Sequence, residues 1–315
     1  MSWFSGVLRV GAAVVLLPLL SVTPAFGWGS DGHKLINRLA GAALPADVPE
    51  FLRSPEGLNA LEYFGPEPDR WRSPAEPELN AAQAPEHFID LEWADLAGTL
   101  PRRRYDFVRA LAAAQAAHPD IPLTPEKVGL QPYVTVEVYE RLKAAMREYR
   151  GLKAANVDTK PVECEIVFLA GWLGHYVGDG SMPLHTSIQY NGWTGPNPNG
   201  YTTEHHIHGL FESDYVHANV KPGDVAPLVT AKPVVLGDVF TDYVAYLRHS
   251  NTLVEKTYQL EKTGAFAGAG TADGKAMIDE RLAAGATELR DMIYTAWVKS
   301  ADPVPEYRAE KPAAK

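Results

Sequence analysis

The stretch GHYVGDGSMPLH at residues 174–185 decides the fold, because it ends a long apolar run with three side chains that bind metal ions. His175 and Asp179 are four residues apart, so a helix would place both on one face, with about 6 Å between their β-carbons. Pro183 should end that helix, and His185 can then turn back toward the same cleft. The stretch predicts a buried helix whose last turns carry metal ligands.

The residues that lead into this stretch, 165–177, are almost wholly apolar, which predicts a helix that is buried on all sides. Gly171, Gly174 and Gly178 lie on the same helical face as His175. Because a glycine inside a helix costs roughly 1 kcal/mol relative to alanine, we expect a close neighbour at that face. The neighbour is either a metal cluster with its substrate or a tightly packed helix. The alternative to metal binding is a simple pairing of the histidine with the aspartate in the core.

A second pair with the same spacing, His208 and Glu212, occurs in HGLFE at residues 208–212. The spacing again brings an imidazole and a carboxylate to one helical face. Nitrogen and oxygen ligands without thiolates suit zinc at a hydrolytic site, where the metal polarises a bound water. The two pairs together predict a zinc site.

The first 27 residues have the pattern of a cleaved secretory signal, with Arg9, an apolar core and a small-residue end. The apolar core is too short for a membrane span, and Pro18 interrupts it. The pattern predicts a secreted or periplasmic protein. Cleavage at residues 1–27 would leave Trp28 first, with a free amino group and a carbonyl oxygen that can chelate a metal together with His33. Otherwise Trp28 is an ordinary hydrophobic residue at a frayed end.

Taken in order, these residues resemble the trinuclear-zinc superfamily of S-one/P-one type single-strand nucleases and bacterial zinc-dependent phospholipases C. The resemblance spans residues 28–212 and includes a His-Phe-Ile-Asp element at residues 87–90. It implies an all-α fold, a single compact multi-helix domain over residues 28–300, and three zinc ions per chain. The metal ligands that it implies are Trp28, His33, Asp69, His87, His175, Asp179, His185, His208 and Glu212.

The resemblance also implies how the ligands are shared among the ions. One zinc would be held by Asp69, His87, His175 and Asp179, a second by His185, His208 and Glu212, and a third by Trp28, His33 and Asp179. Without the resemblance, Asp69 would be interpreted as a turn residue among prolines. Asp90 is a candidate hydrogen-bond partner for an imidazole N–H.

The catalytic residues that the resemblance implies are Asp69, Arg72 and Asp179. In the mechanism that this implies, zinc would hold and activate the attacking water, Asp69 would orient or deprotonate that water, and Arg72 would stabilise the charge that develops on the phosphate. Arg72 favours the nuclease branch, which carries an arginine at this place. An exposed arginine without a role is the alternative.

The predicted function is therefore a zinc-dependent phosphodiesterase, namely an endonuclease on single-stranded DNA or RNA with possible 3′-nucleotidase activity. One alternative is a phospholipase C that acts on phospholipid, and another is a periplasmic zinc-binding protein without catalysis. Aromatic residues that can stack a base are Tyr63, Phe64, Trp71, Trp93, Tyr190, Trp193 and Tyr201.

Composition limits the partners of the chain. Its formal net charge is −10, so it is not a polycation that coats nucleic acid, and a polyanionic substrate must be attracted by local charge. Zinc ions would supply that charge. Cys164 is the only cysteine, which excludes an intramolecular disulfide. No obligate protein partner is evident.

Apolar periodicity predicts one α-rich domain without repeats. The expected helices are Gly32–Ala43, Tyr105–Ala117, Val136–Tyr149, Val162–Gly178, Glu204–His217, Val239–Leu260 and Ala276–Val298. Residues 184–203 are rich in glycine, proline and asparagine and predict a loop near the substrate entrance. Arg102–Arg104 predicts a solvated turn, and residues 301–315 predict a flexible C-terminal tail.

Overall fold

The computed structural model describes residues 28–305. The predicted signal peptide at residues 1–27 lies outside the described residues, and so do residues 306–315 of the predicted tail. No helix within the described range has the length and the apolar content needed to cross a bilayer.

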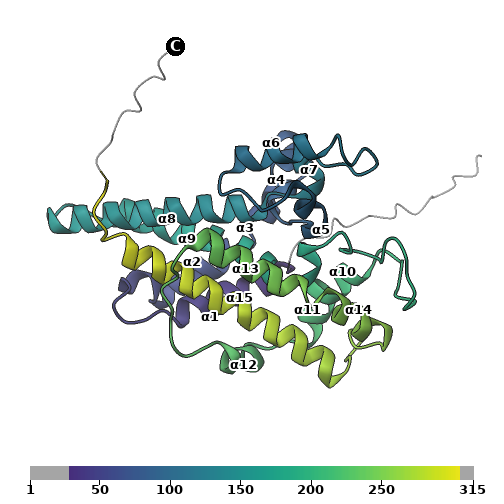
Figure 1. Ribbon diagram of the computed structural model, residues 1–315. Coiled ribbons are helices and arrows are strands. Elements are labelled where there is room, and N and C mark those ends of the chain that lie inside the picture. The colour runs from purple at the N-terminus through teal and green to yellow at the C-terminus, as the bar shows by residue number, and fades with distance from the viewer. Residues whose placement is uncertain (1–27, 306–315) are drawn as a thin grey trace, which may run out of the picture.

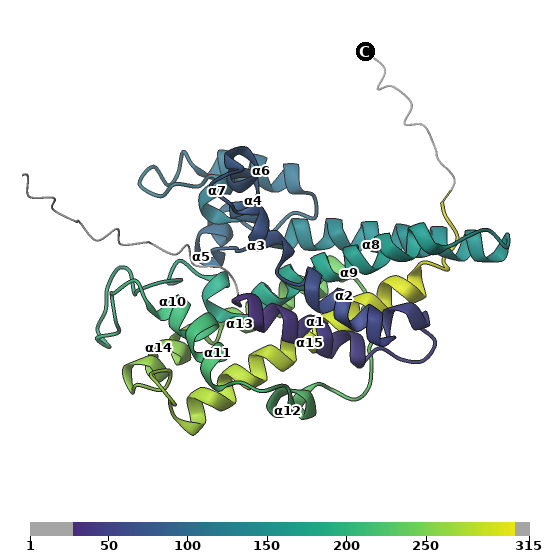
Figure 2. The same ribbon diagram turned by 180° about the vertical axis from the view of Figure 1, so that it is seen from behind.

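Residues 28–305 form an all-α fold, as the sequence predicts, and only two isolated β-bridges, Ile89–Gly129 and Tyr190–Gly192, occur among them. The main bundle consists of α1 (Ser30–Ala42), α2 (Pro55–Phe64), α8 (Gln131–Ala154), α9 (Lys160–Ser181) and α15 (Ala272–Lys299). Shorter helices are α3 (Glu67–Trp71), α4 (Pro77–Gln83), α5 (Leu91–Ala94), α6 (Arg104–Ala114), α7 (Pro125–Val128), α10 (Ile207–Gly209), α11 (Tyr215–Asn219), α12 (Pro222–Val225), α13 (Val239–Asn251) and α14 (Val254–Lys262). Most of the short helices gather at one end of the bundle (Figures 1 and 2).

The centre of the bundle is α9, which packs against α8, α15, α2 and α1. The structure explains its glycines. A β-carbon added at Gly174 would lie 2.2 Å from Asn37 Oδ1 of α1, and one at Gly171 would lie 2.4 Å from Phe64 Cβ of α2. At Gly178 the nearest atom is Nδ1 of His33, at 3.1 Å. Of the two neighbours that the sequence left open, the tightly packed helix is the correct one, and it brings a predicted ligand with it.

Most of the predicted long helices match one helix each, with ends that differ by a few residues: these are α1, α6, α8, α9 and α15. The prediction of one helix over Val239–Leu260 is wrong, because the chain breaks between α13 and α14. At the break, Thr252 Oγ1 donates to the carbonyl of His249, and Asn251 Nδ2 donates to the carbonyl of Thr186. Side-chain bonds of this kind compete with the helical backbone pattern.

The helix predicted over Glu204–His217 is present but begins three residues later, and the chain is helical without interruption from Ile207 to Asn219. The segment divides into α10, a π-helical turn at Leu210–Asp214, and α11. The start of α10 is stabilised by a residue of the preceding loop: the backbone N–H of His208 donates to Asn191 Oδ1. A π-helical turn widens the helix by one residue and occurs mostly at functional sites.

The predicted loop at residues 184–203 is ordered by side chains from elsewhere in the chain. It begins with a 3₁₀ turn, Pro183–Thr186. Tyr258 Oη of α14 donates to the carbonyl of Gln189 and accepts from the backbone N–H of Gly192, at 2.6 and 2.9 Å. The loop therefore has a fixed shape beside the helix ends.

Candidate metal centre

The side chains that the sequence singles out converge at one end of α9. His175 and Asp179 come from α9, and His33 comes from α1, which packs along it. Asp69 belongs to α3 and is therefore helical, not a turn residue. The other ligand candidates come from short segments: His87 follows a 3₁₀ turn, His185 lies in the turn after Pro183, His208 is in α10, and Glu212 is in the π-helical turn.

One group of three, here called the core triad, consists of His87, His175 and Asp179. Asp179 Oδ2 lies 3.2 Å from His87 Nδ1 and 3.4 Å from His175 Nε2. Asp69 Oδ1 adds a fourth oxygen at 3.8 Å from each of the same two nitrogens. The four groups have the separation expected of side chains that surround a single ion.

The other oxygen of Asp179 faces a different nitrogen. Asp179 Oδ1 is 3.4 Å from His33 Nε2, and the ring of His33 stacks on that of His175 with 3.9 Å between the centroids. A carboxylate whose two oxygens face separate nitrogens has the geometry to bridge two ions. His33 also forms a close group with Asp69 and His175, a grouping that the sequence does not predict.

The second group of three, here called the loop triad, consists of His185, His208 and Glu212. Glu212 Oε2 lies 3.0 Å from His208 Nε2 and 3.5 Å from His185 Nε2. The pair His208 and Glu212 keeps its one-turn proximity across the junction of α10 and the π-helical turn. All three side chains are buried.

Backbone carbonyls orient three of the imidazoles in the same way. His175 Nδ1 donates to the carbonyl of Gly65, His185 Nδ1 to that of His87, and His208 Nδ1 to that of Tyr190, at 2.9, 2.7 and 2.9 Å. Each bond fixes the ring and directs Nε2 toward the other ligand candidates, which is the usual arrangement around a metal-binding histidine. Nε2 of His175 lies 3.0 Å from His87 Nδ1 in the same cluster. Backbone carbonyls, and not Asp90, therefore accept the hydrogen bonds from these imidazole N–H groups.

Several polar atoms at the centre of both triads are buried without a hydrogen-bond partner in the described structure. These atoms are both nitrogens of His33, Asp69 Oδ1, both oxygens of Asp179, His185 Nε2 and both oxygens of Glu212. Buried polar atoms are rarely left unpaired, because each one costs about 1–3 kcal/mol. Neighbouring nitrogens and oxygens that converge without bonding one another fit a divalent cation. The residues present thus match the predicted zinc, and the number of ions stays a prediction.

The charges around the triads follow from burial and proximity. Burial, together with the charge of Asp179, raises the pKa of Asp69 well above its usual value. Burial lowers the pKa of His87 to about 4, so this imidazole is neutral, as metal ligation requires. Burial opposes the charged form of His185, but Asp179 and Glu212 outweigh it and raise the pKa of His185 to about 9.

Trp28 is buried at the start of the described chain. Its Nε1 donates to Ser181 Oγ at 2.8 Å, and its ring lies 5.5 Å from that of Phe211. A frayed hydrophobic end is therefore excluded. The predicted ligand role of its amino group depends on cleavage within residues 1–27, which lie outside the described range, so that role stays a prediction.

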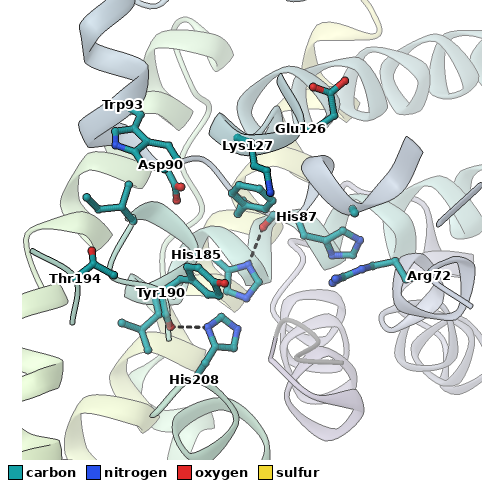
Figure 3. Close-up of a pocket in the computed structure, with 14 residues that line it drawn as sticks. Arg72, His87, Asp90, Trp93, Glu126, Lys127, His185, Tyr190, Thr194 and His208 are labelled. Atoms are coloured by element: carbon teal, nitrogen blue, oxygen red, sulfur yellow. Dashed lines mark hydrogen bonds between the residues drawn. The ribbon is translucent and has the colours of Figure 1, made fainter. Parts of the chain in front are cut away.

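A cavity of about 530 Å³ opens onto both triads (Figure 3). His87 of the core triad and His185 and His208 of the loop triad lie on its wall, together with Arg72. Its other lining residues are Ala84, Phe88, Asp90, Trp93, Glu126, Lys127, Leu184, Ile188, Tyr190 and Thr194. Of the aromatic residues proposed from sequence for stacking, Trp93 and Tyr190 line this cavity. Phe88 and Lys127 also line the cavity, a role that the sequence did not predict.

A buried network that the sequence did not predict joins two ligand segments. Tyr176, next to His175, donates through Oη to Glu86 Oε2 at 3.3 Å, and Glu86 is next to His87. Arg104 donates to Glu86 at 2.8 Å and forms a two-point contact with Glu137. The prediction that Arg104 belongs to a solvated turn is therefore wrong. No local signal marks this network, because its members are far apart in sequence.

Comparisons with known proteins give limited matches. No protein-family model and no curated protein sequence matches the chain. Among solved structures, the chain is similar to an alpha-toxin of Clostridium perfringens from avian strain SWCP, with 13% identity and a TM-score of 0.37, over 87% of this chain and 64% of the toxin chain. The alpha-toxin of Clostridium absonum gives 12% identity and a TM-score of 0.36, over 88% and 67% of the two chains. The chain thus spans less than two thirds of the first toxin, and its function has to be inferred from the site itself.

Proposed function

We propose that this protein is a zinc-dependent hydrolase of phosphoric ester bonds, with single-stranded nucleic acid or nucleotides as substrate and phospholipid as the alternative. The observation that carries the proposal is the pair of buried triads, core and loop, that open onto one cavity beside Arg72. The loop triad offers three protein ligands to an ion, which leaves a coordination position for water or substrate, as is typical of catalytic zinc. This favours an enzyme over a zinc-binding protein without catalysis.

The ligand sets proposed for zinc are those of the resemblance, with Asp69 joining the core triad, Asp179 shared, and Trp28 and His33 completing a third set. When bound there, zinc supplies a water of lowered pKa and polarises a phosphoryl oxygen. Asp69, whose pKa is raised by burial, is suited to accept a proton from an attacking water. Arg72 lies at the cavity wall where it can contact phosphate oxygens and stabilise charge that grows in the transition state.

The choice between nucleic acid and phospholipid rests on the cavity wall. Phe88, Trp93 and Tyr190 offer aromatic surface for an unpaired base. Burial raises the pKa of Asp90 to about 8, so its neutral carboxyl group can both donate a hydrogen bond to a base and accept one from it. Leu184 and Ile188 add apolar wall, which a lipid glycerol group would also contact. The comparisons give the nuclease prediction no support. Phospholipase C activity therefore remains the alternative within this proposal and is assayed beside nuclease activity.

A hydrolysis panel tests the proposal. Full-length protein loaded with zinc is assayed on single-stranded DNA, RNA, duplex of the same sequence, a 3′-nucleotide and phosphatidylcholine, with a chelated sample as control. We expect zinc-dependent hydrolysis, faster on single strands than on duplex, because paired bases cannot stack on the cavity wall. Robust cleavage of phosphatidylcholine without nucleic-acid hydrolysis would replace the nuclease with the phospholipase. Zinc-independent rates on every substrate would refute the proposed function.

Export is part of the same proposal, because a free amino group at Trp28 is needed for the third zinc set. An acylated nitrogen has no lone pair to give. Protein recovered from the periplasm or the medium should have an intact mass that begins at Trp28. Full zinc content in a protein that keeps residues before Trp28 would contradict this role.

A further inference from the structure

The cavity has a second cation besides Arg72. Lys127 lies in α7, and its exposed side chain forms part of the cavity rim. Figure 3 shows its ammonium group directed toward the side of the cavity where His87 lies, whereas the carboxylate of Glu126 points away. Within residues 28–305, Lys127 has neither an ion pair nor a side-chain hydrogen bond. The ammonium is thus available to an anion in the cavity.

The backbone holds Lys127 at a fixed place relative to the metal centre. The residues that follow it run beside the segment of His87: the N–H of Asp90 donates to the carbonyl of Val128, and the N–H of Gln131 to that of Phe88. Gly129 has a φ of +90°, and a β-carbon there would lie 2.1 Å from the carbonyl oxygen of Phe88. Only glycine permits this close approach. The position of Lys127 is therefore set by the same contacts that position the ligand loop.

Arg72 directly follows α3 whereas Lys127 lies in α7, and the two side chains reach the cavity from different walls (Figure 3). A phosphate bound at the triads would contact Arg72, and Lys127 would then be available to a second anion. A nucleic acid strand carries a phosphate at every nucleotide. A phosphatidylcholine molecule carries one phosphate and a cationic head group, which Lys127 would repel.

From these contacts we infer that Lys127 binds the phosphate that flanks the scissile phosphate of an oligonucleotide, and so makes oligonucleotides better substrates than esters with one phosphate. This inference rests on the proposed function and deepens it. Lys127 acts on substrate recognition and not on the reacting atoms. Because the side chain is exposed, its effect is moderate and screened by salt.

The test uses two trinucleotides that differ in one charge. In the first both linkages are phosphates, and in the second the linkage next to the scissile phosphate is a neutral methylphosphonate. For zinc-loaded full-length protein at low salt, we expect kcat/KM to be about 3- to 10-fold higher for the first trinucleotide. Lys127→Met should bring this ratio to about 1, and Lys127→Arg should keep most of it. Lys256→Met is the matched control, because Lys256 is an exposed lysine of α14 outside the cavity and its loss changes net charge equally.

An unchanged ratio in Lys127→Met, with normal hydrolysis by the wild type, would overturn the inference and leave the proposed function standing. An equal fall of the ratio in Lys256→Met would also overturn it, because the effect would then come from net charge. Hydrolysis of phosphatidylcholine alone would overturn the inference and would replace the nuclease with the phospholipase in the proposed function. If no ester is cleaved, the proposed function fails, and the same ratio in equilibrium binding of the two trinucleotides decides the inference.

Discussion

The core triad and the loop triad use the same ligand types but are built in different ways. His175 and Asp179 of the core triad lie on one continuous helix of 22 residues, in its second half, which is buried. His208 and Glu212 of the loop triad lie on a shorter helical segment that contains a π-helical turn, and the carbonyls of His87 and Tyr190 orient the rings of His185 and His208. Helix packing thus positions the first set, and loop hydrogen bonds position the second. Changes in the core triad should affect stability and metal together, and changes in the loop triad should affect mainly the metal.

The largest effect should come from Asp179→Asn. Asp179 has one oxygen toward His33 and the other toward the core triad, so its loss weakens two ion sites at once. We expect turnover to fall roughly 10³-fold or more, with lower zinc content and a lower Tm. Inductively coupled plasma mass spectrometry, calorimetry and steady-state kinetics measure the three quantities.

Glu212→Gln is the comparison variant for the loop triad. It should lose the zinc of that triad and most activity, but its metal-free Tm should fall less than that of Asp179→Asn, because Glu212 lies on a segment outside the central bundle. Equal losses of metal-free stability in the two variants would remove the distinction between the triads. Retention of all zinc and activity by Asp179→Asn would remove the bridging role.

The next effect concerns Arg72, which lies at the cavity shared by the triads. If Arg72 contacts charge that grows in the transition state, Arg72→Ala should lower kcat by roughly 10²- to 10³-fold, or about 2.7–4 kcal/mol, with zinc content unchanged. A change confined to KM that disappears at high salt would show that Arg72 only attracts substrate. Loss of zinc would assign it a structural role.

A pair of glycines separates the two regions by packing alone. A β-carbon at Gly174 in α9 would lie 2.2 Å from Asn37 Oδ1 and 2.6 Å from Leu289 Cδ2, whereas one at Gly209 in α10 would meet no atom within 4 Å. Gly174→Ala should therefore lower the free energy of unfolding by about 1–3 kcal/mol. Gly209→Ala should be neutral or stabilising by up to about 1 kcal/mol. Chemical denaturation of metal-free protein measures both, and equal destabilisation by the two would contradict the comparison.

The smallest effect is a pH dependence of the metal-free protein. The charges of Asp179 and Glu212 outweigh burial and raise the pKa of His185 to about 9, above its unfolded value of about 6.5. A raised pKa contributes stability that is fully present below pH 6.5 and is lost as the pH rises through 9. The Tm advantage of wild type over His185→Gln should therefore shrink between pH 6.5 and 9 in the presence of chelator. An advantage that grows over this range would contradict the raised pKa of His185 and the stabilising effect of Asp179 and Glu212 on its charged form.

The parts of the fold that could be predicted from sequence are those fixed by local periodicity. The apolar run before His175 predicts α9, and the four-residue spacing predicts the closeness of His208 to Glu212. The break after α13 and the late start of α10 were missed because they depend on distant partners, which are Thr186 at the end of α13 and Asn191 at the start of α10. For the same reason, the lining role of Lys127 depends on a backbone contact between separate segments, which no local pattern reveals.

The most direct test of the central claim, that two buried triads form a zinc centre, is anomalous X-ray scattering at the zinc edge from crystals of the mature protein. The account predicts one peak within the core triad beside Asp69 and one within the loop triad between His208 and Glu212. A third peak is expected between His33 and Asp179 when the chain begins at Trp28. Absence of a peak at both triads, or zinc bound only at exposed histidines such as His206 and His217, would contradict the account.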